Sequence, residues 1–145
     1  MSSQRHATVV GLGSVLPERI VSNEWFVSFI DTSDEWIRER TGIRERHYAL
    51  DGQTTSDLAT DATRRALEAA AIAPEQIDLL VCATLTGDTP IPSTSVWVQR
   101  KLGIAAPAFD VNAACAGFSY ALSTATAFIE SGQAETVVVM GAEVL

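Results

Sequence analysis

Residues 108–131 read AFDVNAACAGFSYALSTATAFIES, and this stretch decides the fold that we expect. Residues 108–111 are expected to form a buried strand, and residues 113–131 have the composition of a helix with Glu130 as its one charged side chain. A helix without a polar face is normally buried on all sides. Because one sheet covers only one side of such a helix, we expect a second layer, supplied either by a larger domain or by another chain.

Strand and helix patterns alternate along the whole chain. Strands are expected at residues 8–15, 77–83, 108–111 and 136–140. Helices are expected near residues 23–30, 32–42, 56–72, 93–102 and 113–131. The expected cap positions are Asn23, Thr32 in a T-x-x-E capping box with Glu35, Ser93, Gly42 and Gly103. Strands separated by helices indicate an α/β fold with a mostly parallel sheet.

The composition is that of a folded domain and argues against several classes of protein. The chain has 145 residues, 47% of them hydrophobic, and a formal net charge of -8, with Lys101 as its one lysine. This charge balance does not fit a broad nucleic-acid-binding surface. Residues 111–129 carry no charge, but Asn112 and several Ser and Thr residues interrupt them, so we do not expect a membrane span. The start MSSQRHATVV lacks the apolar core of a secretory signal, and export is not expected.

Two cysteines, Cys82 and Cys115, stand far apart in the sequence. They provide neither a disulfide framework nor the spacing of metal ligands, so we expect a reducing, cytoplasmic location. Cys82 lies within the apolar run LLVCA and is expected to be a core residue.

Cys115 is the candidate nucleophile. It lies where the strand at 108–111 meets the long helix, and the N–H groups and dipole of a helix N-terminus stabilise a thiolate there. The small residues around it leave room for a substrate carbonyl, and a nearby N–H is a candidate oxyanion donor. The spacing is equally compatible with a small buried hydrophobic residue. His6 and His47, the only histidines, are expected at the surface, so no Cys-His dyad is predicted.

The arginine-rich segment WIRERTGIRERH at residues 36–47 is the second candidate site. Its arginines and Trp36 suit a phosphorylated or nucleotide-containing ligand, since a guanidinium binds phosphate bidentately and an indole offers a flat face to a purine. The alternative is a solvated helix face whose arginines pair with Glu35, Glu39 and Glu45.

Three blocks of sequence resemble β-ketoacyl-ACP synthase III of bacterial fatty-acid synthesis. They are DTSDEWI at 31–37, RTGIRERH at 40–47 and AFDVNAACAGF at 108–118. The segments GLGSVLP at 11–17 and IPS at 91–93 are also similar to that family. The resemblance runs over essentially the whole chain but covers only the N-terminal half of that enzyme.

The resemblance implies a thiolase-like α/β fold of layered αβαβα architecture, in which residues 1–145 are the N-terminal half-domain and the C-terminal half is absent. It also implies a homodimer in which Cys115 takes an acyl group from acyl-CoA and passes it to malonyl-ACP by decarboxylative Claisen condensation, without a metal or redox cofactor. The substrate-binding residues that it implies are Thr32, Trp36 and Arg40 at the CoA nucleotide, Ile91 at a position limiting acyl length across the dimer interface, and Leu145 in the acyl pocket.

The departures from the family leave two questions open. The catalytic His and Asn of the family belong to its C-terminal half and have no counterpart here, so we expect that the chain alone does not condense. Ile91 replaces an aromatic residue that is common in short-chain members, which leaves the acyl chain open. The alternatives are a same-fold O- or N-acyltransferase of secondary metabolism and a non-catalytic subunit that binds CoA or a partner.

Overall fold

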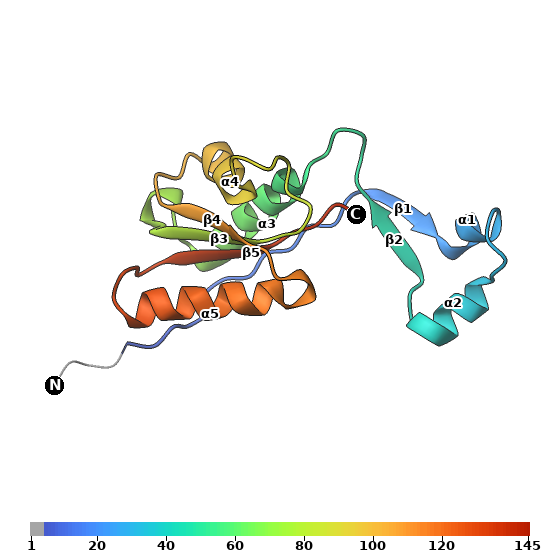
Figure 1. Ribbon diagram of the computed structural model, residues 1–145, viewed down its shortest axis with the longest axis horizontal. Helices are drawn as coiled ribbons and strands as arrows, with labels where there is room; N and C mark the ends of the chain where they lie inside the picture. Colours follow the sequence, from blue (N-terminus) through green and yellow to red (C-terminus); the bar gives the residue numbers. More distant parts are fainter. Residues whose placement is uncertain (1–4) are drawn as a thin grey trace. The chain divides into compact units, whose positions relative to one another are not determined.

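The computed structural model describes residues 5–145, which divide into two compact units (Figure 1). The first unit contains the described residues up to Val15 together with Thr54–Leu145, and the second is Leu16–Gln53. The sequence patterns did not anticipate a separate unit between two parts of the same half-domain.

The first unit is built on a parallel sheet whose strand order is β4-β3-β5. Its described strands are β3 (Leu79–Ala83), β4 (Ala108–Val111) and β5 (Val137–Gly141). β3 has a parallel partner on each edge, and all its residues are buried. The prediction of a parallel sheet is therefore confirmed, with boundaries that shift by at most two residues. The predicted burial holds fully for β3 alone, since β4 is partly buried throughout and β5 buries only Met140.

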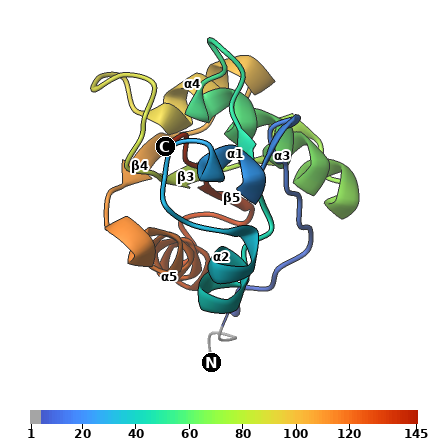
Figure 2. The ribbon, with the colours of Figure 1, turned by 90° about the vertical axis from the view of Figure 1, so that its right-hand side faces the viewer.

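Helices cover both faces of this sheet. α3 (Thr55–Ala70) and α4 (Thr94–Leu102) lie on one face, and α5 (Gly117–Glu130) lies on the other (Figures 1 and 2). Because side chains alternate across a strand, β3 contributes to two separate hydrophobic cores. Leu80 and Cys82 pack with buried residues of α3 and α4, whereas Val81 packs on the α5 side.

α5 buries only one of its faces. Gly117, Ala121 and Ala125 are buried, but Phe118 and Tyr120 are 47% and 59% exposed. This helix thus keeps an uncovered apolar side, as the sequence predicts for a helix without a polar face that meets a single sheet. Neither α5 nor any other helix within residues 5–145 has the length and hydropathy needed to cross a membrane.

The N-termini of α3 and α4 are capped in different ways. Thr54 and Asp57 form a reciprocal capping box, in which the Thr54 N–H donates to the Asp57 carboxylate at 2.9 Å. Ser93 is the N-cap residue of α4, as predicted, but its side chain makes no capping bond. The Asp110 carboxylate of β4 instead accepts hydrogen bonds from the first two N–H groups of α4, at 2.6 and 2.9 Å.

The strand predicted at residues 8–15 is wrong, because this segment pairs with no strand in the described structure. It passes against α3 so closely that a Cβ on Gly11 would lie 2.4 Å from the Ala66 carbonyl oxygen. A cavity of about 300 Å³, lined mainly by apolar residues, lies among residues 7–12, α5 and β5. Alternating apolar residues favour an extended chain, but a strand also needs a partner edge within hydrogen-bond reach.

The second unit contains an antiparallel pair of strands and two short helices. The strands are β1 (Arg19–Ser22) and β2 (Glu45–Tyr48), and the helices are α1 (Asn23–Val27) and α2 (Asp34–Thr41). The strands were not predicted, since RIVS and ERHY have only four residues each and neither shows a clear alternation of apolar and polar residues. α1 ends three residues earlier than expected.

Asn23 has a different role from the predicted helix cap. It is the first residue of α1 and fully buried, and its amide nitrogen donates to the Asp34 carboxylate at 2.7 Å and to the Ile43 carbonyl at 2.9 Å. Its amide oxygen accepts from Arg46. The side chain is used for long-range contacts that connect α1, α2 and β2, so it does not cap its own helix.

Ala71 ends α3 in the left-handed conformation, with φ of 54°. Residues with a Cβ are strained there by about 1 kcal/mol, whereas glycine is not. We therefore expect Ala71→Gly to raise the free energy of unfolding by about 1 kcal/mol. Ala69→Gly, inside the same helix, is the matched control and should lower it by about 1 kcal/mol. Urea denaturation measures both values, and a change of the same sign in both variants would contradict the role of Ala71.

Candidate functional site

The carboxyl ends of the three parallel strands meet at one edge of the sheet. Ala83 of β3 is in register with Val111 of β4 and with Gly141 of β5, so the strands stop level with one another. In open parallel α/β sheets, ligands bind outside this edge, where the following loops gather. The edge is therefore the first place to look for a site in this unit.

Three of the predicted site residues lie on the segments that leave this edge. Ile91 is on the segment after β3, Cys115 follows β4, and Leu145 follows β5. These residues are far apart in the sequence, and the parallel topology brings them to the same side of the sheet. Thr32, Trp36 and Arg40 belong instead to the second unit.

Cys115 is exposed and lies in the 3-10 turn η2 (Ala114–Ala116), directly before α5. The prediction placed it in the first turn of the helix, so the observed position is slightly earlier. A Cβ on Gly117 would lie 3.3 Å from the Ala83 Cβ, which is a tight contact. The absence of a side chain at Gly117 thus lets α5 begin directly beside the end of β3.

The turn that carries Cys115 has two further properties. Ala114, immediately before it, has φ of 47°, in the left-handed region that side chains rarely adopt. Backbone strain of this kind persists only where the surrounding structure imposes it, and it clusters at functional sites. The cap residue of α5, Ala116, provides no side-chain cap, and the first turn of α5 contains no acidic residue that would offset the positive end of its dipole.

Cys82 is fully buried in the core between the sheet and the α3–α4 layer, as predicted. Burial raises the pKa of the Cys82 thiol to about 12, and the nearby carboxylates of Asp110, Glu143 and Asp88 add to this effect. Cys82 is therefore a neutral packing residue at physiological pH.

The histidines occupy different environments. His6 is exposed, as predicted, and its ring lies 4.0 Å from Glu130 at the last residue of α5. Since α5 has 14 residues, His6 is about 20 Å from the Cys115 end of the helix. His47 lies at the surface but is partly covered, because its side chain is 24% exposed and its Nδ1 lies 2.6 Å from the Pro17 carbonyl oxygen. His6 thus provides no base for Cys115.

Trp36 and Arg40 lie on α2, one turn apart. The Trp36 side chain is 54% exposed, and the Arg40 guanidinium carbon lies 5.8 Å from the centre of its ring. Residues four apart on a helix share one face, so the indole and the guanidinium present a joint surface.

Two of the other arginines of this segment are held by neighbours that the sequence did not identify. Arg38 pairs with Asp34 at 3.4 Å, and Arg46 lies 4.6 Å from the centre of the Phe26 ring. The hydrogen bond from Asn23 and the charge of Arg38 hold the pKa of Asp34 below its usual value. The alternative with glutamate partners is not supported, because no ion pair in the described part of the chain joins these arginines to Glu35, Glu39 or Glu45.

Thr32 does not cap α2, which corrects the prediction of a capping box. Ser33 takes the N-cap position, and its hydroxyl accepts the Trp36 N–H at 3.0 Å. The Thr32 hydroxyl is buried and has no hydrogen-bond partner among the described residues. A buried unpaired hydroxyl is unfavourable by about 1–3 kcal/mol, so a hydrogen-bond partner for this group would be stabilising.

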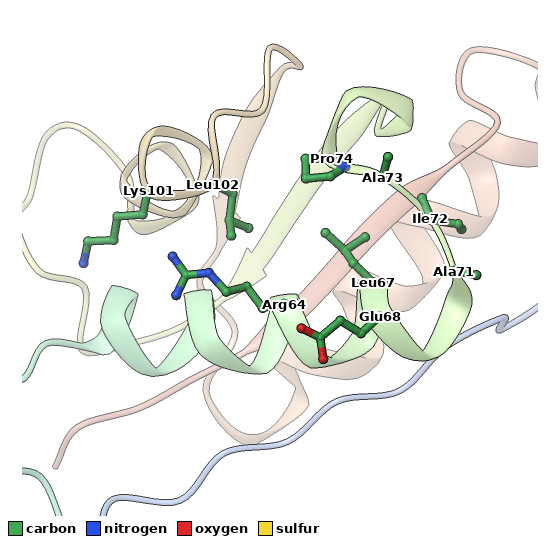
Figure 3. A pocket seen from close by; sticks show the side chains of 9 residues that line it. All are labelled: Arg64, Leu67, Glu68, Ala71, Ile72, Ala73, Pro74, Lys101 and Leu102. Atoms are coloured by element: carbon green, nitrogen blue, oxygen red, sulfur yellow. The ribbon is translucent and has the colours of Figure 1, made fainter.

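A groove of about 490 Å³ runs between the second half of α3 and the end of α4 (Figure 3). Arg64 and Lys101 border it, and Leu67 and Leu102 contribute its apolar surface. It contains none of the predicted site residues and lies away from the carboxyl edge of the sheet, so we do not assign it to the site.

Two carboxylates at the carboxyl edge were missed by the sequence analysis. Asp110 caps α4, and Glu143, two residues after β5, accepts the N–H of Leu85 at 2.8 Å and that of Thr86 at 3.0 Å. An acidic residue at or just beyond the end of a buried strand is a signal that could have drawn attention to them.

Comparisons with known proteins show what this chain is similar to. Over 146 aligned residues the chain is 53% identical to β-ketoacyl-[acyl-carrier-protein] synthase III of Xanthomonas campestris pv. campestris strain 8004, covering 100% of this chain and 45% of the relative. A protein of the same name from Neisseria meningitidis serogroup A is 53% identical over 141 residues, covering 96% of this chain and 44% of the relative. Residues 109–145, which include Cys115, match the family described as 3-oxoacyl-[acyl-carrier-protein (ACP)] synthase III. The chain spans less than half the length of the curated relatives that it matches.

Solved structures of this family have the same fold. The crystal structure of the β-ketoacyl-ACP synthase III from Aquifex aeolicus VF5 superposes with a TM-score of 0.89 at 46% identity, covering 92% of this chain and 44% of that one. The priming β-ketosynthase of the R1128 polyketide pathway superposes equally well, with a TM-score of 0.89 at 41% identity over 97% of this chain and 43% of that one. These matches confirm the thiolase-like fold that the sequence resemblance implies.

The two cysteines should differ sharply in reactivity. At neutral pH we expect Ellman's reagent to label one thiol in the folded chain and both after unfolding, because Cys82 is buried and Cys115 is exposed. Cys115→Ala should remove the fast reaction, whereas Cys82→Ala should retain it. Two thiols that react at the same rate in the folded chain would contradict the assigned burial.

Proposed function

We propose that Cys115 is the acyl-accepting nucleophile of a β-ketoacyl-ACP synthase III that starts fatty-acid synthesis. The observation that carries this proposal is the position of Cys115, exposed on a strained turn at the carboxyl edge of a parallel sheet and next to an uncapped helix N-terminus. The similarity to enzymes of that name supports it.

In the first step, the Cys115 sulfur attacks the carbonyl carbon of acyl-CoA. A tetrahedral oxyanion forms and collapses with cleavage of the bond to the CoA sulfur, and the CoA thiolate leaves and takes up a proton. The product is an acyl thioester on Cys115. Free N–H groups near the start of α5 would stabilise the oxyanion, since donors of this type act where negative charge develops.

In the second step, malonyl-ACP loses CO2, and the resulting carbanion attacks the acyl carbonyl on Cys115. The bond to the Cys115 sulfur breaks, and β-ketoacyl-ACP is released. By the family resemblance, the His and Asn that stabilise the carbanion belong to the C-terminal half. Without them the developing charge lacks its electrophilic partner, so residues 1–145 should accept an acyl group but not condense it.

The CoA nucleotide is proposed to bind at α2. The exposed Trp36 indole would stack on the adenine, Arg40 would contact the nucleotide phosphates, and the unpaired Thr32 hydroxyl would hydrogen-bond the base. Ile91 and Leu145 are proposed to meet the acyl chain, with Ile91 acting across a homodimer interface. The reaction would need no metal or redox cofactor, and the cytoplasm would be its location.

The acylation step can be tested directly with the chain. After incubation with radiolabelled acetyl-CoA, we expect one acetyl group per chain on Cys115 and none on Cys115→Ala. Cys82→Ala, which removes a buried thiol and retains Cys115, is the matched control and should be labelled. With malonyl-ACP added, no β-ketoacyl-ACP should form. A binding subunit without catalytic function would give no Cys115-dependent adduct, and sustained condensation would refute the need for the missing half.

The nucleotide site is tested by affinity for CoA. Trp36→Ala and Arg40→Ala should each weaken CoA binding about tenfold, the effect of removing one well-packed aromatic or charged contact. Arg64→Ala, which removes an arginine from α3 in the other unit, should leave the affinity unchanged. Titration calorimetry with CoA measures all three, and equal affinities would place the nucleotide elsewhere.

A same-fold O- or N-acyltransferase remains the alternative for the second step. It would share acylation of Cys115 and differ in the acceptor. In the longer protein with its acceptor site, formation of β-ketoacyl-ACP from malonyl-ACP would identify the condensing enzyme, and transfer of the acyl group to an alcohol or amine would identify the alternative.

A further inference from the structure

Two exposed apolar side chains, Leu85 and Ile91, project from the segment after β3 at the carboxyl edge of the sheet. Leu85 is 52% exposed and Ile91 is 87% exposed, and Leu145 follows β5 at the same edge. The polar groups of the same segments, in contrast, are held by a dense set of hydrogen bonds. The backbone is thus fixed while the apolar side chains are displayed.

Glu143 is at the centre of this arrangement. Its carboxylate accepts the N–H groups of Leu85 at 2.8 Å and Thr86 at 3.0 Å, and the hydroxyls of Thr86 at 2.5 Å and Thr84 at 3.4 Å. Hydrogen bonds to a charged acceptor are roughly twice as strong as neutral ones. One side chain after β5 therefore holds the start of the segment after β3.

Thr86, in the segment after β3, also binds the segment after β5 and the start of α3. Its hydroxyl accepts the Val144 N–H at 2.9 Å, and its carbonyl accepts the hydroxyl of Thr55 at the start of α3. The residue that precedes Leu145 is thus bound to the segment that leads to Ile91. We define Glu143 and Thr86, with these bonds, as the edge clamp.

The rest of the segment is anchored toward Ile91. Asp88 accepts the Ser56 N–H at 2.8 Å, which ties it to α3. The Thr89 hydroxyl accepts the Trp97 indole N–H at 3.0 Å and donates to the Pro92 carbonyl at 3.0 Å. The chain between the edge clamp and Ile91 is therefore attached to α3 and α4 and has little freedom to move independently.

We propose that Glu143 and Thr86 are positioning residues that set the acyl-length selectivity, because they fix Ile91 and Leu145 in one rigid arrangement. The inference rests on the proposed function, in which these two side chains meet the acyl group. Loosening the edge clamp would change where the end of a long acyl chain meets protein, but it would leave the short acetyl group and the Cys115 turn largely unaffected. We therefore expect loosening of the edge clamp to change the ratio of the acylation rates for long and short acyl groups.

The test compares rates of Cys115 acylation by acetyl-CoA and octanoyl-CoA, followed by intact mass. Thr86→Val keeps the shape of the side chain and removes its hydroxyl, and Glu143→Ala removes the carboxylate. Each should change the octanoyl-to-acetyl rate ratio at least about fivefold, the factor for one lost hydrogen bond. Thr86→Val removes the hydroxyl bonds to Glu143 and Val144, and Glu143→Ala removes all four bonds to the carboxylate. Thr86→Ser restores the hydroxyl and should restore the parental ratio. Glu75→Ala, at an exposed carboxylate of the 3-10 turn η1 (Pro74–Gln76), should leave it unchanged.

The outcomes separate the two proposals. General destabilisation would slow both acylations together and leave their ratio at the parental value, which would overturn the role of the edge clamp. A parental ratio in Thr86→Val with normal acylation would do the same. If the parent chain is acylated by neither CoA ester, the proposed function fails, and the inference falls with it. Backbone amide exchange at Leu85 and Thr86, faster in Glu143→Ala, would show that the variant releases the bonds described above.

Discussion

The complete burial of β3 is the constraint on which the first unit depends. Its residues 79–83 have a parallel partner on each edge and apolar cores on both faces, so no polar side chain has a place within it. Satisfying its backbone groups requires β4 and β5, and covering its faces requires α3 and α4 on one side and α5 on the other. Because all three strands run the same way, their carboxyl ends are forced to one edge. The segments that carry the candidate catalytic and acyl-binding residues all begin there.

Much of the first unit was predictable from the sequence because its signals are local. Periodic apolar residues predict α3, an apolar run predicts β3, and Gly103 ends α4 in the left-handed conformation, as its position indicates. The strand-to-helix junction at Cys115 follows from the same patterns. Both cysteines lie among small or apolar neighbours, so local composition does not show which of them is exposed. Only their positions, Cys82 within an apolar strand and Cys115 at a strand-to-helix junction, indicate that Cys82 is buried and Cys115 exposed.

The remaining features depend on contacts between distant residues, which local patterns do not encode. Asn23 and Thr32 are residue types that commonly cap helices. The Asn23 side chain instead makes hydrogen bonds that connect three elements, and Ser33 is the N-cap of α2 in place of Thr32. β1 and β2 are too short, and alternate too little between apolar and polar residues, to be recognised before their pairing is known. The strand expected at residues 8–15 has the right pattern and no partner edge. Ala114 has a positive φ because of the way β4 and α5 are joined. Alanine does not favour this left-handed conformation, so the residue type gave no signal of it.

The different caps of α3 and α4 imply an order of events during folding. α3 is capped by Thr54 and Asp57, which are three residues apart, so its first turn can be completed as soon as the helix nucleates. The cap of α4 comes from Asp110, which lies 16 residues after the first residue of the helix and on a strand. The first turn of α4 is therefore satisfied only when β4 joins the sheet. Stable α4 should appear late, together with the sheet, whereas α3 is able to form in the unfolded ensemble at an early stage.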